Sequence, residues 1–560
     1  MLHDRMGLEH LAELMHRRGI SHLVISPGSR NAPIIDAFCK RRGFKCKAIV
    51  DERSAAFFAL GMAQQLQQTV AIACTSGTAP LNFAPAIAEA YYQRIPLLVL
   101  TADRPVEFID QGDGQTMRQQ NVFANFIRKS FQFPQSIKTP DDLWYANRLA
   151  SEALNACTEP VPGPVHINLP FSEPLYGVTI PQVPEHKDFT IAETEPVLTE
   201  RAKNELLQDW QSGKKKLVIV GQLAPDPVLS GLLEQLSEDP SVAILTEATS
   251  NLYDSRFIAW IDRCLAAMPA ENQQYVPDLL ITFGGAVVSK RIKSWLRKVP
   301  VKHHWHIDLA DRSMDTYQHL SRSIPMPPLA FFRQWLPMLP KGEGAYAENW
   351  LQLSEKARKA HNAFLQSCPY TDLSIFQKIV EATPAAYDIH LANSTPVRYA
   401  QLFEYKHPFR FDSNRGVSGI DGSISTAAGA AFISGKPTLM ITGDLGFFYD
   451  SNALWNKHLP AKLKIIVINN GGGGIFRYLE GPDKTGLLEE FFEASHDTSA
   501  EYIAKAFGFD YFQAFDEESL GRELPAFFRP GSKASILEVK SPAKESAATL
   551  RAYFRHLAGA

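Results

Sequence analysis

The chain has 560 residues, a formal net charge of −3, 45% hydrophobic residues and 21% charged residues. This length exceeds what one hydrophobic core organises, so we expect three or four domains of ordinary globular composition. The small net charge gives no electrostatic basis for binding nucleic acid or an anionic membrane surface.

The N-terminal segment, MLHDRMGLEHLAELMHRRGI, is charged and helical in period, and it lacks an apolar stretch followed by a cleavage site of small residues. No later stretch approaches the roughly 18 apolar residues of a membrane span. The six cysteines form no CxxC pair. These features predict a reduced, cytoplasmic protein without structural zinc and without a membrane partner.

Short β-rich apolar runs alternate with amphipathic segments along the first third of the chain. The expected strands are HLVIS (22–26), KAIV (47–50), VAIACT (70–75), PLLVLTAD (96–103) and VHINLP (165–170). This alternation is typical of a parallel sheet covered by helices. We expect a first domain at 1–181 and a linker rich in proline and charge at 182–199.

The same rhythm resumes twice after the linker. The second set of expected strands is KKKLVIVG (214–221), VAILTE (242–247), DLLITFGG (278–285) and HHWHIDL (303–309). The third set is YDIHLANS (387–394), FRFDSN (409–414), PTLMITGD (437–444), KLKIIVINN (462–470) and SILEVK (535–540). We predict an α/β protein with three doubly wound parallel-sheet domains, at 1–181, 200–345 and 346–560, that bind ligands at the carboxyl ends of their strands.

Four consecutive glycines follow the expected strand KLKIIVINN, although a simple turn does not require such a run. Asp444 also follows an expected strand, and Asn470 lies 26 positions after it, leaving room for a helix over NALWNKHL. In a βαβ unit these strand ends share one edge of the sheet, so their oxygens can face each other. A carboxylate, an amide oxygen and a glycine carbonyl suit Mg²⁺ bound together with a diphosphate. The alternative is a tight turn with a capping aspartate.

The GD and NN spacing resembles the diphosphate and metal motif of thiamine diphosphate enzymes, whose usual form is GDG followed by NN. The resemblance implies that Asp444, Asn470 and the carbonyl of Gly472 hold Mg²⁺ or Mn²⁺. Leu445 replaces the second glycine of GDG in this chain. The implied cofactor contacts along the two loops are Gly443, Asp444, Leu445, Asn470, Gly472, Gly473 and Ile475.

Enzymes of this class use a glutamate, hydrogen-bonded to the aminopyrimidine ring, to promote loss of the C2 proton of the cofactor. Glu52 in VDERSAAFFALGMA fits, because it follows an expected strand of the first domain. Alternatively, Asp51 and Glu52 stabilise the N-terminus of a helix that begins near Ser54. The resemblance also implies an apolar support for the cofactor at Ile420, otherwise a core residue, and a contact from Ser394 near the diphosphate.

Four loops beyond expected strands carry arginine beside small polar residues: SPGSRNAP, TADRP, NSTPVR and SNRGVSGIDG. Guanidinium groups bind carboxylates through two hydrogen bonds and stay charged when partly buried. Any one of these arginines could instead form a surface or interdomain ion pair. Together, Arg30, Arg104, Arg398 and Arg415 predict substrates with several carboxylates.

A set of strings in fixed order identifies a narrower family. SPGSRNAP, VDERSAAFFALGMA, TSGTAPLN, TADRP, GDGQTMRQ, NSTPVR, SNRGVSGIDG, GDLGFFYDSNALWN and NNGGGGIF resemble the 2-succinyl-5-enolpyruvyl-6-hydroxy-3-cyclohexene-1-carboxylate synthases, the MenD family of menaquinone biosynthesis. The resemblance implies a thiamine diphosphate-dependent transferase of the transketolase class. It would decarboxylate 2-oxoglutarate and add the succinyl-semialdehyde carbanion to isochorismate by 1,4-addition. It further implies a homodimer or homotetramer with the active site between subunits.

The residues that this resemblance assigns come from all three expected domains. The implied catalytic residues are Glu52, Arg30, Gln115, Arg398 and Arg415. The implied substrate-binding residues are Ser29, Arg30, Arg104, Gln115, Lys290, Arg398, Arg415 and Phe476. Lys290 could equally be a solvated helix charge, and Gly114 stands where some members carry asparagine.

Three alternatives remain. The nearest is another thiamine diphosphate enzyme, a 2-oxo acid decarboxylase or an acetolactate-type synthase, although the latter often binds a flavin in a central domain and KLVIVGQLAPDP contains no GxGxxG. A nicotinamide- or nucleotide-binding protein would leave Glu52 and the 26-residue spacing without a role. A catalytically silent homologue would not need Glu52, Asp444 and Asn470.

Overall fold

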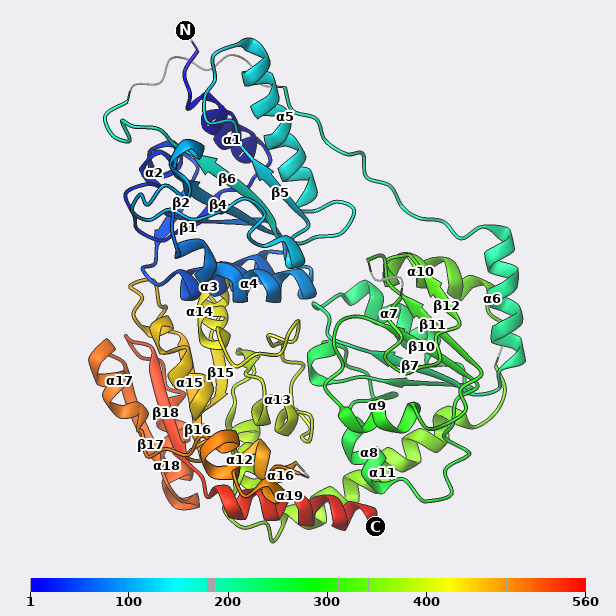
Figure 1. Cartoon of the computed structure of the whole chain (residues 1–560). Helices are drawn as coiled ribbons and strands as arrows, with labels where there is room; N and C mark the ends of the chain where they lie inside the picture. The colour runs from blue at the N-terminus through cyan, green and yellow to red at the C-terminus, as the bar shows by residue number, and fades with distance from the viewer. Residues whose placement is uncertain (1, 179–186, 311–312, 341, 480, 560) are drawn as a thin grey trace. The chain divides into compact units, whose positions relative to one another are not determined.

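A computed structural model of the chain describes residues 2–178, 187–310, 313–340, 342–479 and 481–559 (Figure 1). The chain forms two compact units. The first comprises Met1–Glu193, Gly416–Thr438 and Phe448–Leu463, and the second comprises Thr194–Arg415, Leu439–Phe447 and Lys464–Ala560. Within the described ranges, no helix combines the length and the apolar character needed to cross a membrane. The predicted α/β class with three parallel sheets is confirmed, and the predicted domain boundaries stay a prediction.

The first sheet has the strand order β2-β1-β3-β4-β6-β5, with all neighbours parallel. Its strands are β1 (His22–Ile25), β2 (Lys45–Ala48), β3 (Val70–Cys74), β4 (Leu97–Asp103), β5 (Lys129–Gln132) and β6 (Val165–Pro170). Helices α1 (Met6–Arg17) and α5 (Pro140–Ala156) lie on one face, and α3 (Glu52–Leu66) and α4 (Ala79–Gln93) lie on the other (Figure 1). The order reverses between β1 and β3, so the loops after these strands flank the expected ligand crevice.

Helix α14 (Ser423–Ser434) packs directly against the backbone of α3 within the first unit. A Cβ atom added to Gly61 would lie 2.0 Å from the Thr426 carbonyl oxygen, and one added to Gly429 would lie 1.9 Å from the Phe58 carbonyl oxygen. Neither neighbour is a flexible side chain that could move aside. Glycine at both positions therefore sets the separation of the two helices.

We expect Gly61→Ala to destabilise the protein by about 3 kcal/mol, the upper end of the usual cost of overpacking, because the added methyl group meets main-chain atoms. Thermal unfolding followed by circular dichroism measures this. The matched control is Gly521→Ala on α18 (Glu517–Phe527), where an added Cβ meets nothing within 4 Å and alanine should be neutral or stabilising. Equal melting temperatures for both variants would contradict the direct backbone contact.

The central sheet of the second unit has the order β12-β11-β10-β7-β8-β9, again all parallel. Its strands are β7 (Lys216–Val220), β8 (Val242–Leu245), β9 (Phe257–Ile258), β10 (Leu279–Phe283), β11 (His303–Ile307) and β12 (Arg322–Ile324). The core on one face contains Trp210 of α6 (Glu200–Ser212), Trp305 of β11 and Trp335 of α10 (Pro328–Trp335). Helices α8 (Ile261–Ala267), α9 (Lys290–Leu296) and α11 (Tyr346–Leu365) contribute to the core on the other face.

Main chain fills the point where the order of the central sheet reverses, between β7 and β10. The Gly285 N–H donates to the Gln222 carbonyl over 2.8 Å, and the Gly221 N–H donates to the Phe283 carbonyl over 2.9 Å. A Cβ atom on Gly221 would lie 2.0 Å from the Gly285 carbonyl oxygen. Sheets with this strand order commonly bind a dinucleotide at this crevice. Here the two loops bind each other instead.

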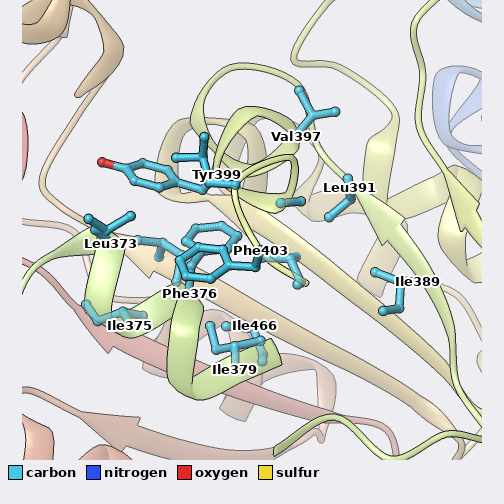
Figure 2. Close-up of a cluster of buried hydrophobic side chains, with 14 of the residues drawn as sticks. Leu373, Ile375, Phe376, Ile379, Ile389, Leu391, Val397, Tyr399, Phe403 and Ile466 are labelled. Atoms are coloured by element: carbon cyan, nitrogen blue, oxygen red, sulfur yellow. The ribbon is translucent and has the colours of Figure 1, made fainter. Parts of the chain in front are cut away.

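The third sheet has the order β14-β13-β15-β16-β18-β17, which repeats the pattern of the first. Its strands are β13 (Asp388–Leu391), β14 (Phe411–Asp412), β15 (Thr438–Gly443), β16 (Leu463–Asn469), β17 (Asp510–Ala514) and β18 (Ser535–Lys540). Figure 2 shows part of its core, where Phe376 of α12 (Asp372–Ala382) stacks on Tyr399 with ring centroids 5.1 Å apart, near Ile466 of β16. The loops after β13 and β15 flank the reversal of strand order.

The four strands that the sequence did not predict, β5, β9, β12 and β17, all lie at sheet edges. They are short or only partly buried, so they lack the continuous apolar run that marks the central strands. The helix predicted over NALWNKHL is displaced. Helix α15 (Asp444–Tyr449) begins directly after β15, and a short 3-10 turn follows at Ser451–Leu454.

Candidate active site

Glu52 is the first residue of α3 and follows the end of β2 closely. The neighbouring Asp51 is the helix cap, because its side chain accepts a hydrogen bond from the Ser54 N–H over 2.9 Å. Burial raises the pKa of Glu52. Burial, and then the charge of Glu52, raise the pKa of the Cys74 thiol, which places Glu52 near the end of β3. Glu52 is therefore a half-buried carboxylate near the carboxyl ends of the strands of the first sheet. Asp51, and not Glu52, caps the helix.

Two of the predicted arginines lie near each other, in the loops that follow β1 and β4. Arg30 is 5% exposed and its Nη2 lies 3.2 Å from Glu173 Oε1. Arg104 donates through Nη2 to the Gly114 carbonyl over 2.8 Å, and its Nη1 lies 3.5 Å from Asp113 Oδ2. Burial, followed by repulsion from Arg104, lowers the pKa of Arg30. An anionic ligand between these groups would relieve that repulsion.

The loops after β3 and β4 meet beside these arginines. Gln115 has a left-handed backbone with φ 54°, and a Cβ atom on Gly77 would lie 3.2 Å from the Gln115 Cα. The buried Gln119 joins the loops, because Oε1 accepts from the Gly77 N–H over 3.2 Å and Nε2 donates to the Ala102 carbonyl over 3.1 Å. The predicted Ser29, in the loop after β1, is exposed.

Ile420 lies in the loop before α14 and is 40% exposed, so it is not a core residue of the first unit. Glu89 of α4 holds the start of this loop. Its carboxylate accepts from the Gly416 N–H over 2.6 Å and from the Val417 N–H over 2.8 Å. The loop leading to Ile420 is thereby fixed to α4 within the first unit.

In the second unit, Asp444 lies between the ends of β15 and β16. It is 2% exposed; Oδ2 accepts from the Gly472 N–H over 2.9 Å and Oδ1 accepts from the Leu445 N–H over 2.6 Å. Leu445 thus supplies a main-chain donor, although it replaces the usual glycine. Burial raises the pKa of Asp444 despite these hydrogen bonds. A nearby cation would stabilise its charged form.

Asn470 presents an unsatisfied acceptor beside Asp444. Its Oδ1 is buried and has no hydrogen-bond partner in the structure. Asp372, a buried carboxylate at the start of α12, lies close to this side chain and accepts a hydrogen bond from the Ser541 hydroxyl. The Asn470 amide oxygen is therefore available to another ligand.

These groups fit a hard divalent cation. Across the described ranges, no cluster of three or more His, Cys, Asp or Glu side chains is placed to hold a metal ion. A metal here would depend on the Asp444 carboxylate, the Asn470 amide oxygen and a main-chain carbonyl, the donor types that Mg²⁺ and Mn²⁺ prefer. Gly472 has φ 150°, and its carbonyl accepts one hydrogen bond from Gly474 over 2.9 Å, which leaves one lone pair.

The remaining predicted cofactor contacts are distributed along the same two loops. Gly443 is the last residue of β15, whereas Ile475 and Phe476 begin α16 (Ile475–Tyr478). The Gly473 N–H donates to the Glu493 carbonyl over 2.6 Å, so this N–H is already used within the protein.

A small pocket adjoins Asn470. Its lining includes the charged side chains of Arg398, Asp262 and Asp372 and the largely apolar side chains of Tyr399, Leu550 and Phe554. The full lining is Asp262, Asp372, Thr395, Arg398, Tyr399, Leu402, Asn470, Gly474, Ile475, Tyr478, Ala543, Ser546, Ala547, Leu550 and Phe554. The predicted metal ligand Asn470 and the predicted substrate ligand Arg398 thus line one cavity.

Three cations gather near this pocket. Arg415 is 8% exposed and donates to Asn393 Oδ1 over 2.8 Å. Burial, and then repulsion from Arg415, lower the pKa of Arg398, which donates to the Ser394 carbonyl. Burial lowers the pKa of Lys293, to which Arg415 also contributes. This concentration of buried and half-buried positive charge suits an anionic ligand.

Two further predicted residues are Ser394, which has an unusual backbone conformation, and Lys290, which is exposed. Ser394 has φ 73°, a strained backbone for a residue other than glycine, and such strain is found at functional sites. Lys290 is the first residue of α9 and its side chain is exposed. Lys293, one turn further along this helix, is half-buried.

Sequence reasoning missed Lys293, Asp262 and His496. Lys293 follows Lys290 by three positions in VVSKRIKSW, a spacing that places both on neighbouring turns, so the helical period could have suggested it. Asp262 and His496 stand in segments without a recognisable motif.

His496 Nε2 lies 3.6 Å from Asp444 Oδ2, and its Nδ1 accepts from the Thr498 N–H over 3.0 Å. In the neutral ring the proton is therefore on Nε2.

Comparison with known proteins places this arrangement in a family. Residues 5–123 match the N-terminal binding domain of thiamine pyrophosphate (thiamine diphosphate) enzymes, and residues 183–391 match the middle domain of these enzymes. The 2-succinyl-5-enolpyruvyl-6-hydroxy-3-cyclohexene-1-carboxylate synthase of Flavobacterium johnsoniae is 41% identical over the full length of both chains. The chain belongs to this synthase family. The MenD-family proteins of Porphyromonas gingivalis (39% identity, 99% of this chain and 98% of the relative) and Bacteroides thetaiotaomicron (38%, full length of both) agree.

Proposed function

We propose that the protein is a thiamine diphosphate-dependent 2-succinyl-5-enolpyruvyl-6-hydroxy-3-cyclohexene-1-carboxylate synthase. It would decarboxylate 2-oxoglutarate and add the remaining four-carbon unit to isochorismate in menaquinone biosynthesis, with release of CO₂. The observation that carries this proposal is the pocket that joins Asn470, with its unsatisfied oxygen, to the half-buried cation Arg398. Family membership over the whole chain supports it.

The residues divide the proposed chemistry among them. Thiamine diphosphate, when bound, would supply a carbon nucleophile for the 2-oxo group and an electron sink for the loss of CO₂. Glu52 would exchange a proton with the aminopyrimidine ring, a task that suits a half-buried carboxylate of raised pKa. Asp444, Asn470 and the Gly472 carbonyl would hold Mg²⁺ or Mn²⁺ against the diphosphate. Arginines would bind and orient the substrate carboxylates and compensate their charge away from water.

We further infer the assembly and the domain limits that this function needs. In the proposed enzyme, a first domain at 1–181 binds the pyrimidine end of the cofactor and a third domain at 346–560 binds the diphosphate, with a central domain at 200–345 between them. The active site would lie between subunits of a cytoplasmic homodimer or homotetramer. Sedimentation equilibrium with and without cofactor tests the assembly.

A different thiamine diphosphate enzyme is the second candidate. Acetolactate-type synthases often hold a flavin in a central domain, but in this chain hydrogen-bonded main chain at Gly221 and Gly285 fills the reversal point of the central sheet. The buried arginines also exceed what a small monocarboxylic substrate requires. Incubation with 2-oxoglutarate, isochorismate, Mg²⁺ and thiamine diphosphate distinguishes the candidates. The proposal requires CO₂ release coupled to loss of isochorismate absorbance, and CO₂ release without that loss would overturn it.

We expect Arg398→Ala and Arg415→Ala each to raise the KM for the carboxylate substrates by about 10- to 100-fold, because a charged hydrogen bond contributes about 1.5–3 kcal/mol. Initial-rate kinetics with each substrate varied in turn measures this. Arg201→Ala removes an exposed arginine that pairs with Glu205 on its own helix, and it serves as the control. If KM stayed unchanged in both site variants, these arginines would not bind the substrate carboxylates.

A further inference from the structure

The proposed metal ligands follow Asn469, the first asparagine of the NN pair and the last residue of β16. Asn469 is 3% exposed, and its side chain points into the protein rather than to solvent. Its Oδ1 accepts a hydrogen bond from the Gly471 N–H over 3.1 Å. Asn469 therefore contacts the glycine loop without being one of the proposed ligands.

Glu538 of β18 holds the other end of the Asn469 side chain. The Asn469 Nδ2 donates to Glu538 Oε1 over 2.5 Å and to the Thr498 carbonyl over 2.9 Å. The side chain of Glu538 is fully buried, and Oε2 accepts from Ser499 Oγ over 2.7 Å and from the Tyr511 hydroxyl over 2.6 Å. Although burial would raise the pKa of Glu538, these donors hold it below its usual value. Glu538 is thus a fixed anionic acceptor.

The hydrogen bonds close into a ring around Gly471. The His496 N–H donates to the Gly471 carbonyl over 3.0 Å, and the Thr498 N–H donates to His496 Nδ1 over 3.0 Å. Thr498 in turn accepts from Asn469. Both polar groups of Gly471 are therefore held, its N–H by Asn469 and its carbonyl by His496.

Asp444 also holds the peptide unit between Gly471 and Gly472, because its Oδ2 accepts a hydrogen bond from the Gly472 N–H. Gly471 has φ 77° and Gly472 has φ 150°, and glycine populates positive and negative φ about equally, so its own backbone preference does not fix this loop. The direction of the Gly472 carbonyl depends on these restraints. A shift of the loop would misplace that carbonyl and the adjacent Asn470.

We propose that Asn469, supported by Glu538, is a positioning residue that fixes the Gly471–Gly472 main chain at the proposed metal site. This inference rests on the proposed function, since it presumes that the Gly472 carbonyl and Asn470 bind the cation. Partners of this kind, which orient metal ligands through hydrogen bonds, commonly change metal affinity by about 10- to 100-fold when removed.

The test is calorimetric titration of Mn²⁺ into the full-length protein saturated with thiamine diphosphate, without substrate. We expect Asn469→Ala to raise the Kd for Mn²⁺ by about 10- to 100-fold. At saturating Mn²⁺ its kcat should fall by less than about threefold, because the metal ligands remain. Thr498→Ala is the matched control, since Thr498 joins the ring through its main chain and its side chain is exposed. Its Kd should match that of the wild type.

A swap of donor and acceptor separates positioning from general destabilisation. Asn469→Asp keeps an acceptor for Gly471 but places two carboxylates together, so Mn²⁺ binding should weaken. The double variant Asn469→Asp/Glu538→Gln restores a hydrogen bond of reversed direction and should recover part of that loss. If the folded Asn469→Ala variant bound Mn²⁺ as the wild type does, or the double variant bound it no better than Asn469→Asp, the proposal would be wrong.

Failure of the metal site itself would look different. The wild type would then bind no Mn²⁺ with the cofactor present, or Asp444→Asn would bind it unchanged. That result would overturn the proposed function at this loop. Normal behaviour of the wild type and Asp444→Asn, with unaltered binding by the Asn469 variants, would remove only the positioning role.

Discussion

Glu52→Gln should reduce kcat by about 10²- to 10⁴-fold while leaving the fold and cofactor binding intact, because a positioned proton-transfer group contributes about that much. Glutamine preserves the size of the side chain and can still accept a hydrogen bond, but it cannot exchange a proton with the aminopyrimidine ring. Steady-state kinetics with both substrates measures the loss. Exchange of the cofactor C2 proton for deuterium, followed by NMR on the bound cofactor, should slow in parallel.

Asp51→Asn provides the control for this variant. It removes a negative charge from the adjacent position, yet asparagine caps helices as well as aspartate does, so the bond to the Ser54 N–H and the start of α3 are preserved. We expect near-normal turnover. Near-normal activity of Glu52→Gln, or an equal loss in Asp51→Asn, would show that Glu52 is not the activating carboxylate.

The sequence predicts the buried parts of the fold better than its borders. Strands such as β4 and β16 are buried along their whole length and read as continuous apolar runs. The edge strand β5, KSFQ, has one fully buried residue and no such run, so no local signal distinguishes it from a loop. The start of α15 at Asp444 was missed for a related reason. A helix that begins directly on a strand end depends on tertiary contacts rather than on a separate amphipathic segment.

The candidate site divides in the same way. Asp444 and Asn470 follow predictable strands at a diagnostic spacing, so the sequence brings them together. Lys293 and Asp262 reach the pocket region only through the packing of α8 and α9, which a single sequence does not encode locally. The prediction named Lys290, which is exposed, whereas Lys293 on the same helix is half-buried. The sequence does not distinguish the two lysines by burial, and the role of Lys290 stays a prediction.

Asp444→Asn should weaken binding of Mg²⁺ or Mn²⁺ by more than about 100-fold, above the range for residues that merely orient ligands. The variant preserves the size of the side chain, but it removes the one anionic group among the three proposed ligands. It also places an amide N–H₂ or a neutral oxygen where Oδ2 accepts the Gly472 N–H. Because the cation would bridge protein and diphosphate, cofactor affinity should fall with it. Calorimetric titration of thiamine diphosphate at fixed Mg²⁺ measures this.

The control is Asp516→Asn, which changes the cap of α18 in the same unit, where asparagine substitutes well. It should bind metal and cofactor as the wild type does. The burial of Asp444 also predicts how Asp444→Asn changes the stability of the metal-free protein. A buried carboxylate whose pKa is raised is costly to ionise without a partner, so its neutral replacement should leave the metal-free protein at least as stable while metal binding is lost. A variant with unchanged metal affinity would show that the charge at position 444 serves the fold and not a cation.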